Sequence, residues 1–329
     1  MENGYRTVDS IEQGLPYPVV ALGFFDGVHL GHQVILDLVQ ERAQSHGGTS
    51  MVLTLDQHPL VVISKEEPPQ LLTTLPERID LLLASGVNRV VTVGFNQEFA
   101  SMSPEEFVEE ILVQRLQVKE VVAGHDYRFG HRASGDMALM KQLGKKFGFS
   151  VLVVAPVERE GARVSSTKIR RLLQEEGNVE AAAKLLQREY SLQGIVVPGK
   201  QRGRKLGFPT ANIQVDAHKI VPADGVYAVK VYLPEGYLGG GGAEVQGLNG
   251  RDQWFTGVLS ISHNPTFDEK QRTVEVHLLD FSGDLYGRNL RLEFIQYLRP
   301  IYRFEAVADL VKQVEQDKAT ARVLLEEYR

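Results

Sequence analysis

The hydrophobic pattern of this chain changes near residue 190. Between Tyr17 and Pro156, short β-branched runs alternate with segments whose apolar residues recur at helical spacing. This alternation predicts βα units that feed a parallel sheet. After Tyr190, strand-like runs follow one another without helices between them, which predicts an antiparallel sheet or barrel. We therefore expect two domains, residues 1–187 and residues 188–329.

The first domain is expected to be α/β, with a doubly wound parallel sheet. Its expected strands are Pro18–Leu22, Met51–Leu55, Arg89–Val93, Glu120–Ala123 and Val151–Ala155. Its expected helices are Gly31–Ser45, Pro76–Ser85, Pro104–Gln114 (opened by a capping box at Ser103 and Glu106), Asp136–Phe147, Lys168–Glu176 and Val179–Leu186, with Gly177 between the last two.

The second domain is expected to be an antiparallel β-barrel with a C-terminal helix. Its expected strands are Gln193–Val197, Gly225–Leu233, Trp254–Ser260, Arg272–Asp280 and Asn289–Tyr297. The amphipathic stretch Phe304–Tyr328 predicts a helix packed on that barrel. We interpret the glycine run Gly239–Gly242 as a flexible loop, because no helix follows it to form a phosphate site.

Composition removes several classes of function. The chain has no cysteine, which excludes a disulfide scaffold, a thiolate nucleophile, a cysteine-ligated zinc site and an iron–sulfur cluster. No secretory signal is visible, and no apolar run approaches the roughly 18 residues that span a bilayer, so we expect a cytoplasmic protein without a membrane partner. The net charge of -6 argues against bulk nucleic-acid binding.

The segment Gly23–His32, GFFDGVHLGH, joins the first expected strand to the first expected helix. A strand-to-helix turn points backbone N–H groups at a ligand above the carboxyl edge of the sheet. His29 and His32 can hydrogen-bond to phosphates, and Gly31 lets the ligand approach the backbone. The segment therefore predicts phosphate recognition. Incidental surface histidines and a purely conformational turn remain as alternatives, and zinc is disfavoured because no third ligand lies at a partnering spacing.

This segment resembles the HxGH signature of the nucleotidyltransferase superfamily, whose members attack the α-phosphate of ATP and release pyrophosphate. A second motif of that superfamily is matched by Ser165–Arg170, SSTKIR, which follows the fifth expected strand and opens a helix. Hydroxyls and N–H groups at a helix N-terminus, followed by a cation on the first turn, form an anion site. The alternative is an ordinary Ser/Thr helix cap with a solvated arginine.

Further motifs extend the resemblance to the bacterial bifunctional riboflavin kinase/FAD synthetases: Phe95–Ala100 (FNQEFA), Gly124–Gly130 (GHDYRFG) and Gly135-Asp136. The resemblance implies a nucleotidyltransferase (Rossmann-like) domain that joins the AMP of ATP to FMN. The chain departs from the family at Leu55–Pro59 (LDQHP), where a phenylalanine and a second proline are usual, so the effect of Gln57 on the FMN or ATP pocket stays open. The implied site residues are His29, His32 and Arg170 for catalysis, Asp126 for flavin, and Gly23, Phe25, Asp26, Gly27, Gly31, Ser165, Ser166 and Thr167 for ATP.

A second constellation, Gly199–Asn212, reads GKQRGRKLGFPTAN. Its glycines permit close backbone approach and its four cations attract phosphates, while the Thr210 hydroxyl and the Asn212 amide oxygen suit Mg²⁺. It is not a Walker A loop, since no Gly-Lys-Ser/Thr ending leads into a helix. The alternative is a basic surface hairpin, with Pro209 and Asn212 in its turn.

Gly207–Asn212 (GFPTAN) resembles the PTAN signature of flavokinases, and the pattern continues at Asn264–Phe267 (NPTF), Val274–His277 (VEVH), Asp280-Phe281, Asp284–Gly287 (DLYG), Leu298-Arg299 and Phe304. The resemblance thus spans about Val19 to Arg322. It implies a riboflavin kinase in which Glu275 is the general base. The other implied residues are Thr210 and Asn212 for the metal, Arg299 for flavin, and Gly199, Lys200, Gly203, Lys205, Gly207 and Pro209 for ATP.

Three neighbours of this constellation stay outside the predicted site. We interpret His277 as a histidine that is hydrogen-bonded beside the site, and Trp254 and Tyr286 as core aromatic residues. A lone strand glutamate such as Glu275 is ordinarily solvent-facing and silent, so its role depends on the resemblance.

The function that the resemblance implies is FAD biosynthesis: riboflavin is phosphorylated to FMN, and FMN is adenylylated to FAD, with two ATP molecules and Mg²⁺. The expected partners are these small molecules, without nucleic acid or membrane, in a monomer or weak oligomer. Two alternatives stay open. A nucleotidyltransferase of other specificity explains His29 and His32 but not Thr210 and Glu275. A flavin-responsive binding or regulatory protein keeps the fold without turnover.

Overall fold

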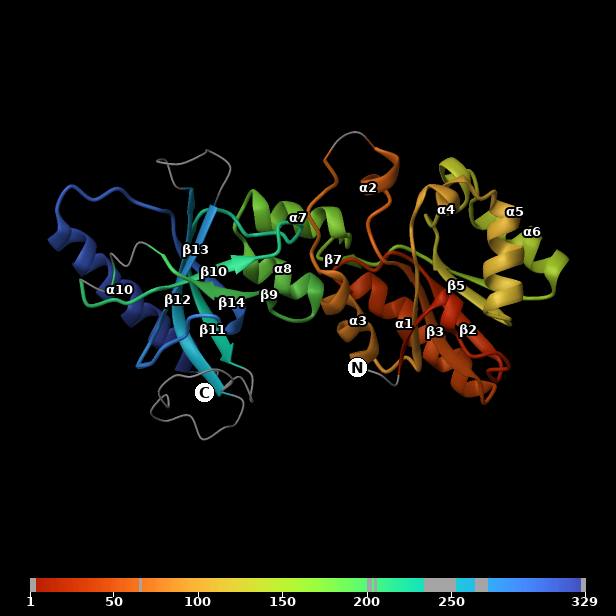
Figure 1. Cartoon of the computed structure of the whole chain (residues 1–329), viewed down its shortest axis with the longest axis horizontal. Coiled ribbons are helices and arrows are strands. Elements are labelled where there is room, and N and C mark those ends of the chain that lie inside the picture. Colours follow the sequence, from red (N-terminus) through yellow and green to blue (C-terminus); the bar gives the residue numbers. More distant parts are fainter. Residues whose placement is uncertain are drawn as a thin grey trace. The chain divides into compact units, whose positions relative to one another are not determined.

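The computed structural model describes residues 4–64, 67–199, 203, 206–233, 253–263 and 272–326. The chain divides into two compact units, residues 1–166 and 167–329, drawn in sequence colours in Figure 1. Helices α7 (Ser166–Gln174) and α8 (Val179–Leu186) lie between the end of the first unit and the expected domain boundary after residue 187. That boundary stays a prediction.

A six-stranded parallel sheet forms the centre of the first unit, in the order β1-β4-β3-β2-β5-β6. Its strands are β1 (Tyr5–Thr7), β2 (Pro18–Leu22), β3 (Thr49–Leu55), β4 (Arg89–Val93), β5 (Glu120–Gly124) and β6 (Ser150–Val154). The strand order reverses at β2, which pairs with β3 on one side and with β5 on the other. Open α/β sheets bind ligands above the carboxyl ends of their strands at such a reversal.

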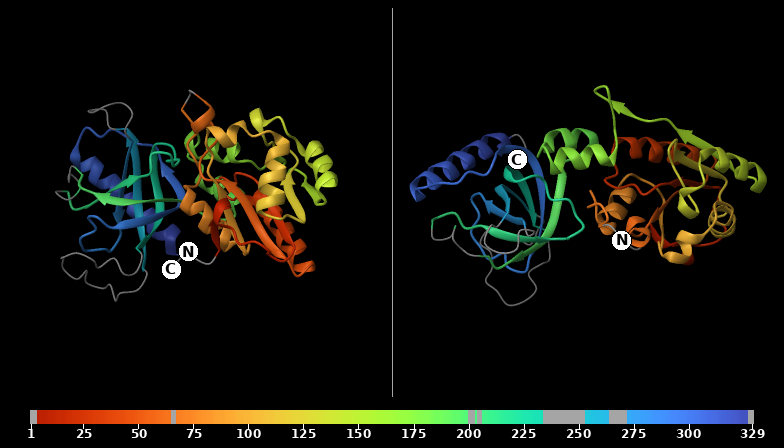
Figure 2. Two further views of the ribbon diagram at one scale, coloured as in Figure 1. Left: turned by 45° about the vertical axis from the view of Figure 1, so that its right-hand side comes forward. Right: turned by 90° about the horizontal axis from the view of Figure 1, so that it is seen from above.

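Helices cover both faces of this sheet, as Figures 1 and 2 show. Those named below are α1 (Leu30–Ser45), α2 (Leu60–Ile63), α3 (Leu75–Ala84), α4 (Gln97–Ser101), α5 (Pro104–Glu106), η2 (Phe107–Arg115) and α6 (Met137–Phe147). Successive strand residues point to opposite faces. In β2, Val19 and Ala21 pack in the core formed with α1 and α3, whereas Val20 and Leu22 pack in the core formed with η2 and α6. The predicted doubly wound sheet is confirmed.

The predicted helix Pro104–Gln114 is wound in two ways. Ser103 and Glu106 form the predicted capping box, and α5 begins after it. From Phe107 the chain continues as the π-helix η2. The sequence missed β1, α2, α4 and the hairpin of β7 (Glu158–Arg159) and β8 (Ala162–Arg163), because elements this short show too little periodicity to be recognised.

The second unit holds a closed antiparallel barrel in the order β10-β13-β12-β11-β14-β9. Its strands are β9 (Tyr190–Val197), β10 (Ala211–Val215), β11 (Gly225–Leu233), β12 (Gln253–His263), β13 (Arg272–Leu278) and β14 (Asn289–Arg299). The terminal helix α10 (Val307–Glu326) packs on the barrel, where Ala321 and Leu325 join Ala228, Leu279 and Ile295. The predicted barrel and its C-terminal helix are confirmed.

Strand β10 was not predicted. The alternative that placed Pro209 and Asn212 in the turn of a surface hairpin is wrong for Asn212, which lies in β10 and pairs with Val197 of β9 and Glu275 of β13. Strand β10 is five residues long and contains Asn212 and Gln214. A strand so short and polar carries a weak hydrophobic signal.

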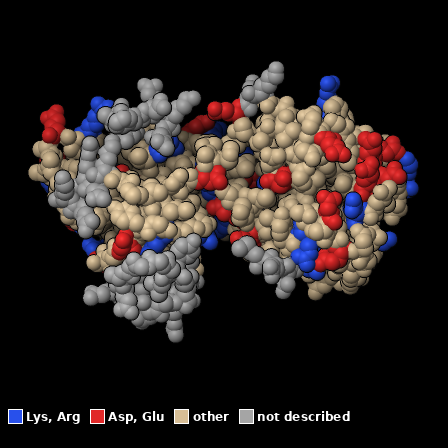
Figure 3. Space-filling model, in the orientation of Figure 1, with Lys and Arg blue, Asp and Glu red and all other residues tan. Residues whose placement is uncertain are grey.

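Three further observations concern the surface charge, the helices and the clustering of possible metal ligands. Figure 3 shows acidic and basic side chains interspersed on one face of the molecule. Within the described ranges, none of the helices has the length and apolar character that crossing a membrane requires. In the same part of the chain, no three His, Cys, Asp or Glu side chains come together as ligands of a metal ion.

Candidate active sites

The turn between β2 and α1 is wound through the left-handed region of the backbone. Phe25 has φ +56°, Gly27 has φ +82° and Val28 has φ +41°. A β-branched residue such as Val28 rarely adopts a positive φ, and such strain collects at functional sites. A Cβ on Gly23 would lie 2.9 Å from the ring of Phe25. The absence of a side chain at Gly23 therefore leaves room for the Phe25 ring in the core.

Asp26 holds this turn in place. Its carboxylate is buried and accepts hydrogen bonds from the backbone N–H of Leu72 and from both the backbone N–H and the hydroxyl of Thr73, at 3.0–3.1 Å. The Thr73 hydroxyl in turn accepts from the backbone N–H of Gly27 at 3.1 Å. The segment before α3 thus anchors the turn before α1. A direct contact of Asp26 with ATP stays a prediction.

His29 and His32 lie at the start of α1, with their rings stacked at a centroid distance of 3.6 Å. His29 is buried and is the N-cap of the helix, because its Nδ1 accepts from the backbone N–H of His32 at 3.3 Å. From this bond we assign the His29 proton to Nε2, which leaves Nε2 as a donor. A Cβ on Gly31 would lie 3.2 Å from the His29 ring, so Gly31 makes room for it.

The N-terminus of α7 approaches the same turn through Ser166, whose hydroxyl donates to the backbone carbonyl of Asp26 at 3.0 Å. Ser165 precedes Ser166, and both residues are half-buried. Thr167 and Arg170 follow on α7, in the second unit. The structure therefore brings together residues from both motifs of the first predicted site, 140 positions apart in the sequence.

Asp126, the predicted flavin contact, follows β5 at the carboxyl edge of the sheet. Its exposed side chain forms an ion pair with Arg163 of β8, and its other carboxylate oxygen lies 3.9 Å from Nδ1 of His125. The Gln57 side chain, at the departure from the family pattern, donates to the backbone carbonyl of Phe95 at 2.8 Å. Gln57 therefore ties the loop after β3 to the loop after β4.

In the barrel, the side chains of Thr210 and Glu275 are hydrogen-bonded to each other. The Thr210 hydroxyl donates to a carboxylate oxygen of Glu275 at 3.2 Å, across 65 positions of sequence. Asn212 lies opposite Glu275 in the register of β10 and β13. The predicted alternation of β13 is confirmed: Val274, Val276 and Leu278 are buried, whereas Glu275 is half-buried on the other face.

Three glycines of the second constellation have different surroundings. A Cβ on Gly199 would lie 2.0 Å from the amide nitrogen of Asn212, so that side chain packs directly on the Gly199 backbone. A Cβ on Gly203 would lie 2.4 Å from the carbonyl oxygen of Phe208. Gly207 has φ +88°, a conformation that favours glycine. The predictions for Lys200, Lys205, Asn264–Phe267 and Gly239–Gly242 concern residues outside the described ranges.

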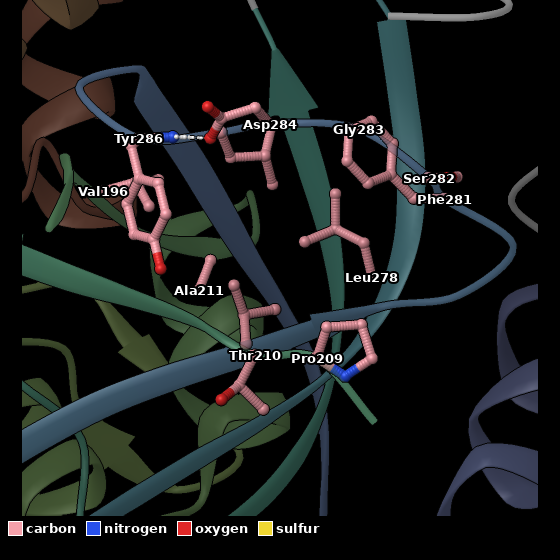
Figure 4. Close-up of a pocket in the computed structure, with 12 residues that line it drawn as sticks. Val196, Pro209, Thr210, Ala211, Leu278, Phe281, Ser282, Gly283, Asp284 and Tyr286 are labelled. Carbon is pink, nitrogen blue, oxygen red and sulfur yellow. Dashed lines mark hydrogen bonds between the residues drawn. The ribbon is translucent and has the colours of Figure 1, made fainter. Parts of the chain in front are cut away.

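A pocket of about 590 Å³ opens beside Thr210. Figure 4 shows Pro209 and Thr210 at one end of it and Asp284 at the other. Tyr286 lines the pocket and is 47% exposed, so the prediction that it is a core residue is wrong. Its backbone N–H donates to the Asp284 carboxylate at 3.0 Å. Tyr286 lies within a turn before β14, where strand alternation gives no guide to burial.

The other two neighbours also have defined places. Nδ1 of His277 lies 2.8 Å from the carbonyl oxygen of Pro209, which confirms the hydrogen-bonded histidine beside the site. Trp254 is 47% exposed and packs on Tyr232 at a centroid distance of 5.0 Å, so the prediction that it is a core residue is also wrong. The prediction that both aromatic residues lie in the core rests on the usual burial of large rings in strands.

Arg299, the predicted flavin contact of the barrel, binds helix α10. Its guanidinium makes a two-pronged ion pair with Asp317 at 2.7–3.1 Å, and both side chains are largely buried. Gln313 donates to the same carboxylate at 3.0 Å. Arg299 therefore fastens α10 to the end of β14, and a contact with flavin stays a prediction.

Sequence reasoning missed two residues that organise the first site, Thr73 and Arg78. Thr73 belongs to none of the motifs, although Thr74 and Glu77, which follow it, form a capping box that indicates the start of α3. Arg78 is almost fully buried in α3. An arginine in an amphipathic helix ordinarily predicts a solvent-facing position.

Known proteins match both units. Residues 12–168 match the family model described as FAD synthetase, and residues 186–325 match the model described as riboflavin kinase. The bifunctional riboflavin kinase/FMN adenylyltransferase of Bacillus subtilis is 37% identical over 308 residues, covering 92% of this chain and 91% of the relative. The protein of the same name from Escherichia coli K12 is 34% identical over 304 residues, with 92% and 91% covered.

One solved structure agrees in fold over almost the full length. It is called a macrolide-efflux protein from Streptococcus pneumoniae and superposes with a TM-score of 0.82 at 31% identity, covering 96% of this chain and 97% of that chain. Both family models, the two relatives and the geometry of the two candidate sites indicate the same family. The chain therefore belongs to the family of bifunctional riboflavin kinase/FMN adenylyltransferases.

Proposed function

We propose that the barrel phosphorylates riboflavin to FMN and that the α/β unit adenylylates FMN to FAD, each with its own ATP. The observation that carries this proposal is the contact between Thr210 and Glu275 beside the barrel pocket, in a chain whose other unit holds His29 and His32 at a helix start. A nucleotidyltransferase of other specificity would not explain the contact between Thr210 and Glu275.

In the proposed kinase site, Glu275 is the general base. Its carboxylate accepts the proton of the riboflavin 5′-hydroxyl as that oxygen bonds to the γ-phosphorus and the bond from the γ-phosphorus to the bridging oxygen of ATP breaks. The hydrogen bond from Thr210 orients the carboxylate at 3.2 Å. A positioned base of this kind contributes about 10²–10⁴-fold to the rate.

The oxygen donors of this site fit Mg²⁺. The Thr210 hydroxyl and the Asn212 amide oxygen are ligand types that Mg²⁺ accepts, and the packing of Asn212 on Gly199 restricts that amide. We propose that Thr210 and Asn212 would hold the ion with the ATP phosphates. When bound, Mg²⁺ would neutralise charge on the transferring phosphoryl group. The glycines Gly199, Gly203 and Gly207, with Pro209, are proposed to let ATP approach the backbone.

In the proposed adenylyltransferase site, an FMN phosphate oxygen attacks the α-phosphorus of ATP, and pyrophosphate leaves. The attacking phosphate is already anionic, so alignment and charge stabilisation carry the catalysis without a general base. His29 donates through Nε2 to the departing phosphates because its Nδ1 is occupied as the helix cap. His32, Ser166, Thr167 and Arg170 are proposed as the other contacts, and Asp126 as a contact to flavin.

We further propose a cytoplasmic location, a monomer or weak oligomer, small-molecule partners without nucleic acid, and a domain boundary near residue 187. Each rests on the sequence and on membership of the family.

Incubation of the full chain with riboflavin, ATP and Mg²⁺ tests this proposal, with FMN and FAD separated by chromatography over time. FMN is expected to appear first and FAD second. A chain that binds flavin but forms neither nucleotide would support the regulatory alternative. A chain that leaves FMN unchanged with ATP but adenylylates another phosphorylated precursor would support the other specificity.

A further inference from the structure

Arg78 of α3 is a buried cation beneath the carboxyl edge of the parallel sheet. Its side chain is 1% exposed. Two of its guanidinium nitrogens, Nε and Nη1, have no hydrogen-bond partner among the described residues. Burial lowers the pKa of Arg78 to about 10, although Asp26 and Asp56 favour its charged form. An arginine placed here for packing alone would be replaced to advantage by an apolar side chain.

The contacts that Arg78 does make lead to loops of the first site. Its guanidinium carbon lies 4.1 Å from the centre of the Phe24 ring, in the loop after β2. Its Nη2 donates to the carbonyl oxygen of Leu55, the last residue of β3. The guanidinium therefore joins the loop after β2 to the end of the neighbouring strand β3.

The loop after β4 joins this arrangement through Asp56 and Gln57. The Asp56 carboxylate accepts from the backbone N–H of Phe95 at 2.9 Å, and the Gln57 amide donates to the Phe95 carbonyl at 2.8 Å. His58 lies edge-on to Phe24, with ring centroids 5.2 Å apart. One buried guanidinium thus stabilises the place where the loops after β2, β3 and β4 meet.

The loop after β2 that carries Phe24 also forms the turn around Asp26, which Thr73 and Ser166 hold by hydrogen bonds. Arg78 therefore lies where that turn of the first site meets the end of β3. We propose that Arg78 is a positioning residue that fixes these loops for adenylyl transfer, an inference that rests on the proposed function.

Arg78→Met in the full chain separates this role from packing, because methionine fills the volume without a charge. We expect the kcat/KM for FAD formation from FMN and ATP to fall about tenfold or more through displacement of the loops, with the kinase rate within about twofold and the thermal midpoint unchanged or higher. Arg78→Lys is expected to recover part of the loss, because the ammonium keeps the charge over Phe24.

Arg42→Met is the matched control. Arg42 pairs with the buried Glu120 at 2.7–2.8 Å, and that pair lies at the amino end of β5, away from the site. We expect this variant to lower the thermal midpoint and leave the kcat/KM for FAD formation and the kinase rate unchanged.

Three results would overturn the role of Arg78: an unchanged kcat/KM for FAD formation in Arg78→Met, an equal fall in the kinase rate of that variant, or the same fall in FAD formation in Arg42→Met. If Arg78→Met does not fold, an unchanged kcat/KM for FAD formation in folded Arg78→Lys overturns the proposal, and a lowered one supports it. If the parent chain forms no FAD from FMN and ATP, the proposed function fails before the variants are compared.

Discussion

The two sites of this molecule are constructed in different ways. The proposed adenylyltransferase site rests on a strand-to-helix turn in which Asp26 and His29 are buried and hydrogen-bonded to backbone N–H groups. In the proposed kinase site, Thr210 is exposed just before β10, and Glu275 is half-buried on β13. In the first site, proposed functional side chains also hold the backbone, whereas in the second the side chains of Thr210 and Glu275 bond to each other. Substitutions should therefore couple chemistry to stability in the first site and separate them in the second.

The largest effect on activity is expected for His29→Ala. Loss of a donor to the departing phosphates should lower FAD formation from FMN about 10²–10³-fold. Because His29 also caps α1, thermal unfolding should show the first unit destabilised by about 0.5–2 kcal/mol. Riboflavin phosphorylation should stay nearly intact. Equal losses of both activities would contradict the assignment of His29 to one site.

Glu275→Gln sharpens the other half of the comparison. The amide keeps the shape of the carboxylate and an acceptor for Thr210 but removes the base, so kinase turnover should fall at least about tenfold. FAD formation from supplied FMN and the thermal midpoint should be unchanged. A kinase rate equal to that of the parent chain would remove Glu275 from its proposed role.

Gly199→Ala tests the barrel site without touching a reacting group. The new Cβ would overlap the Asn212 amide, which lies at the end of a flexible side chain and can move away. We expect the Mg²⁺ concentration for half-maximal kinase activity to rise several-fold, with little change in stability. A Mg²⁺ titration curve identical to that of the parent chain would contradict the proposed role of Asn212.

The smallest effect on activity is expected outside both sites, at Glu120. Its hydrogen bonds from Arg42, followed by one from Tyr17, lower the pKa of its carboxyl below the usual 4.5, despite burial. A lowered carboxyl pKa stabilises the fold at neutral pH, and that contribution is lost as the pH falls below 4.5 through the lowered value.

Glu120→Gln should therefore be less stable than the parent chain at pH 7, by about 1–3 kcal/mol from the weakened buried hydrogen bonds. The difference should narrow in acid, as measured by denaturant unfolding at several pH values. A difference that stays constant below the usual pKa would contradict the account of Glu120. Both activities at pH 7 should match those of the parent chain.

The sequence predicted both folds because alternation and helical periodicity extend over many residues. It predicted His29, His32, Thr210 and Glu275 through motifs, and the structure brings each pair together. It did not predict Arg78 as an organising residue, because the partners of Arg78 lie in the loop after β2 and at the end of β3, and only the fold brings them to α3.

Arg299 is a second example. A motif singles out Arg299, but its ion pair with Asp317 depends on where α10 packs on the barrel, which neither periodicity nor a local motif predicts. Contacts between residues far apart in the sequence are therefore what could not be predicted here.

A mixing experiment tests the central claim most directly, namely that two separate sites act in succession. The His29→Ala chain should convert riboflavin to FMN but form almost no FAD, and the Glu275→Gln chain should convert supplied FMN to FAD but phosphorylate riboflavin slowly. Mixed together with riboflavin, ATP and Mg²⁺, the two variants should form FAD through released FMN. A mixture that forms no more FAD than either variant alone, although each keeps its single activity, would contradict the account.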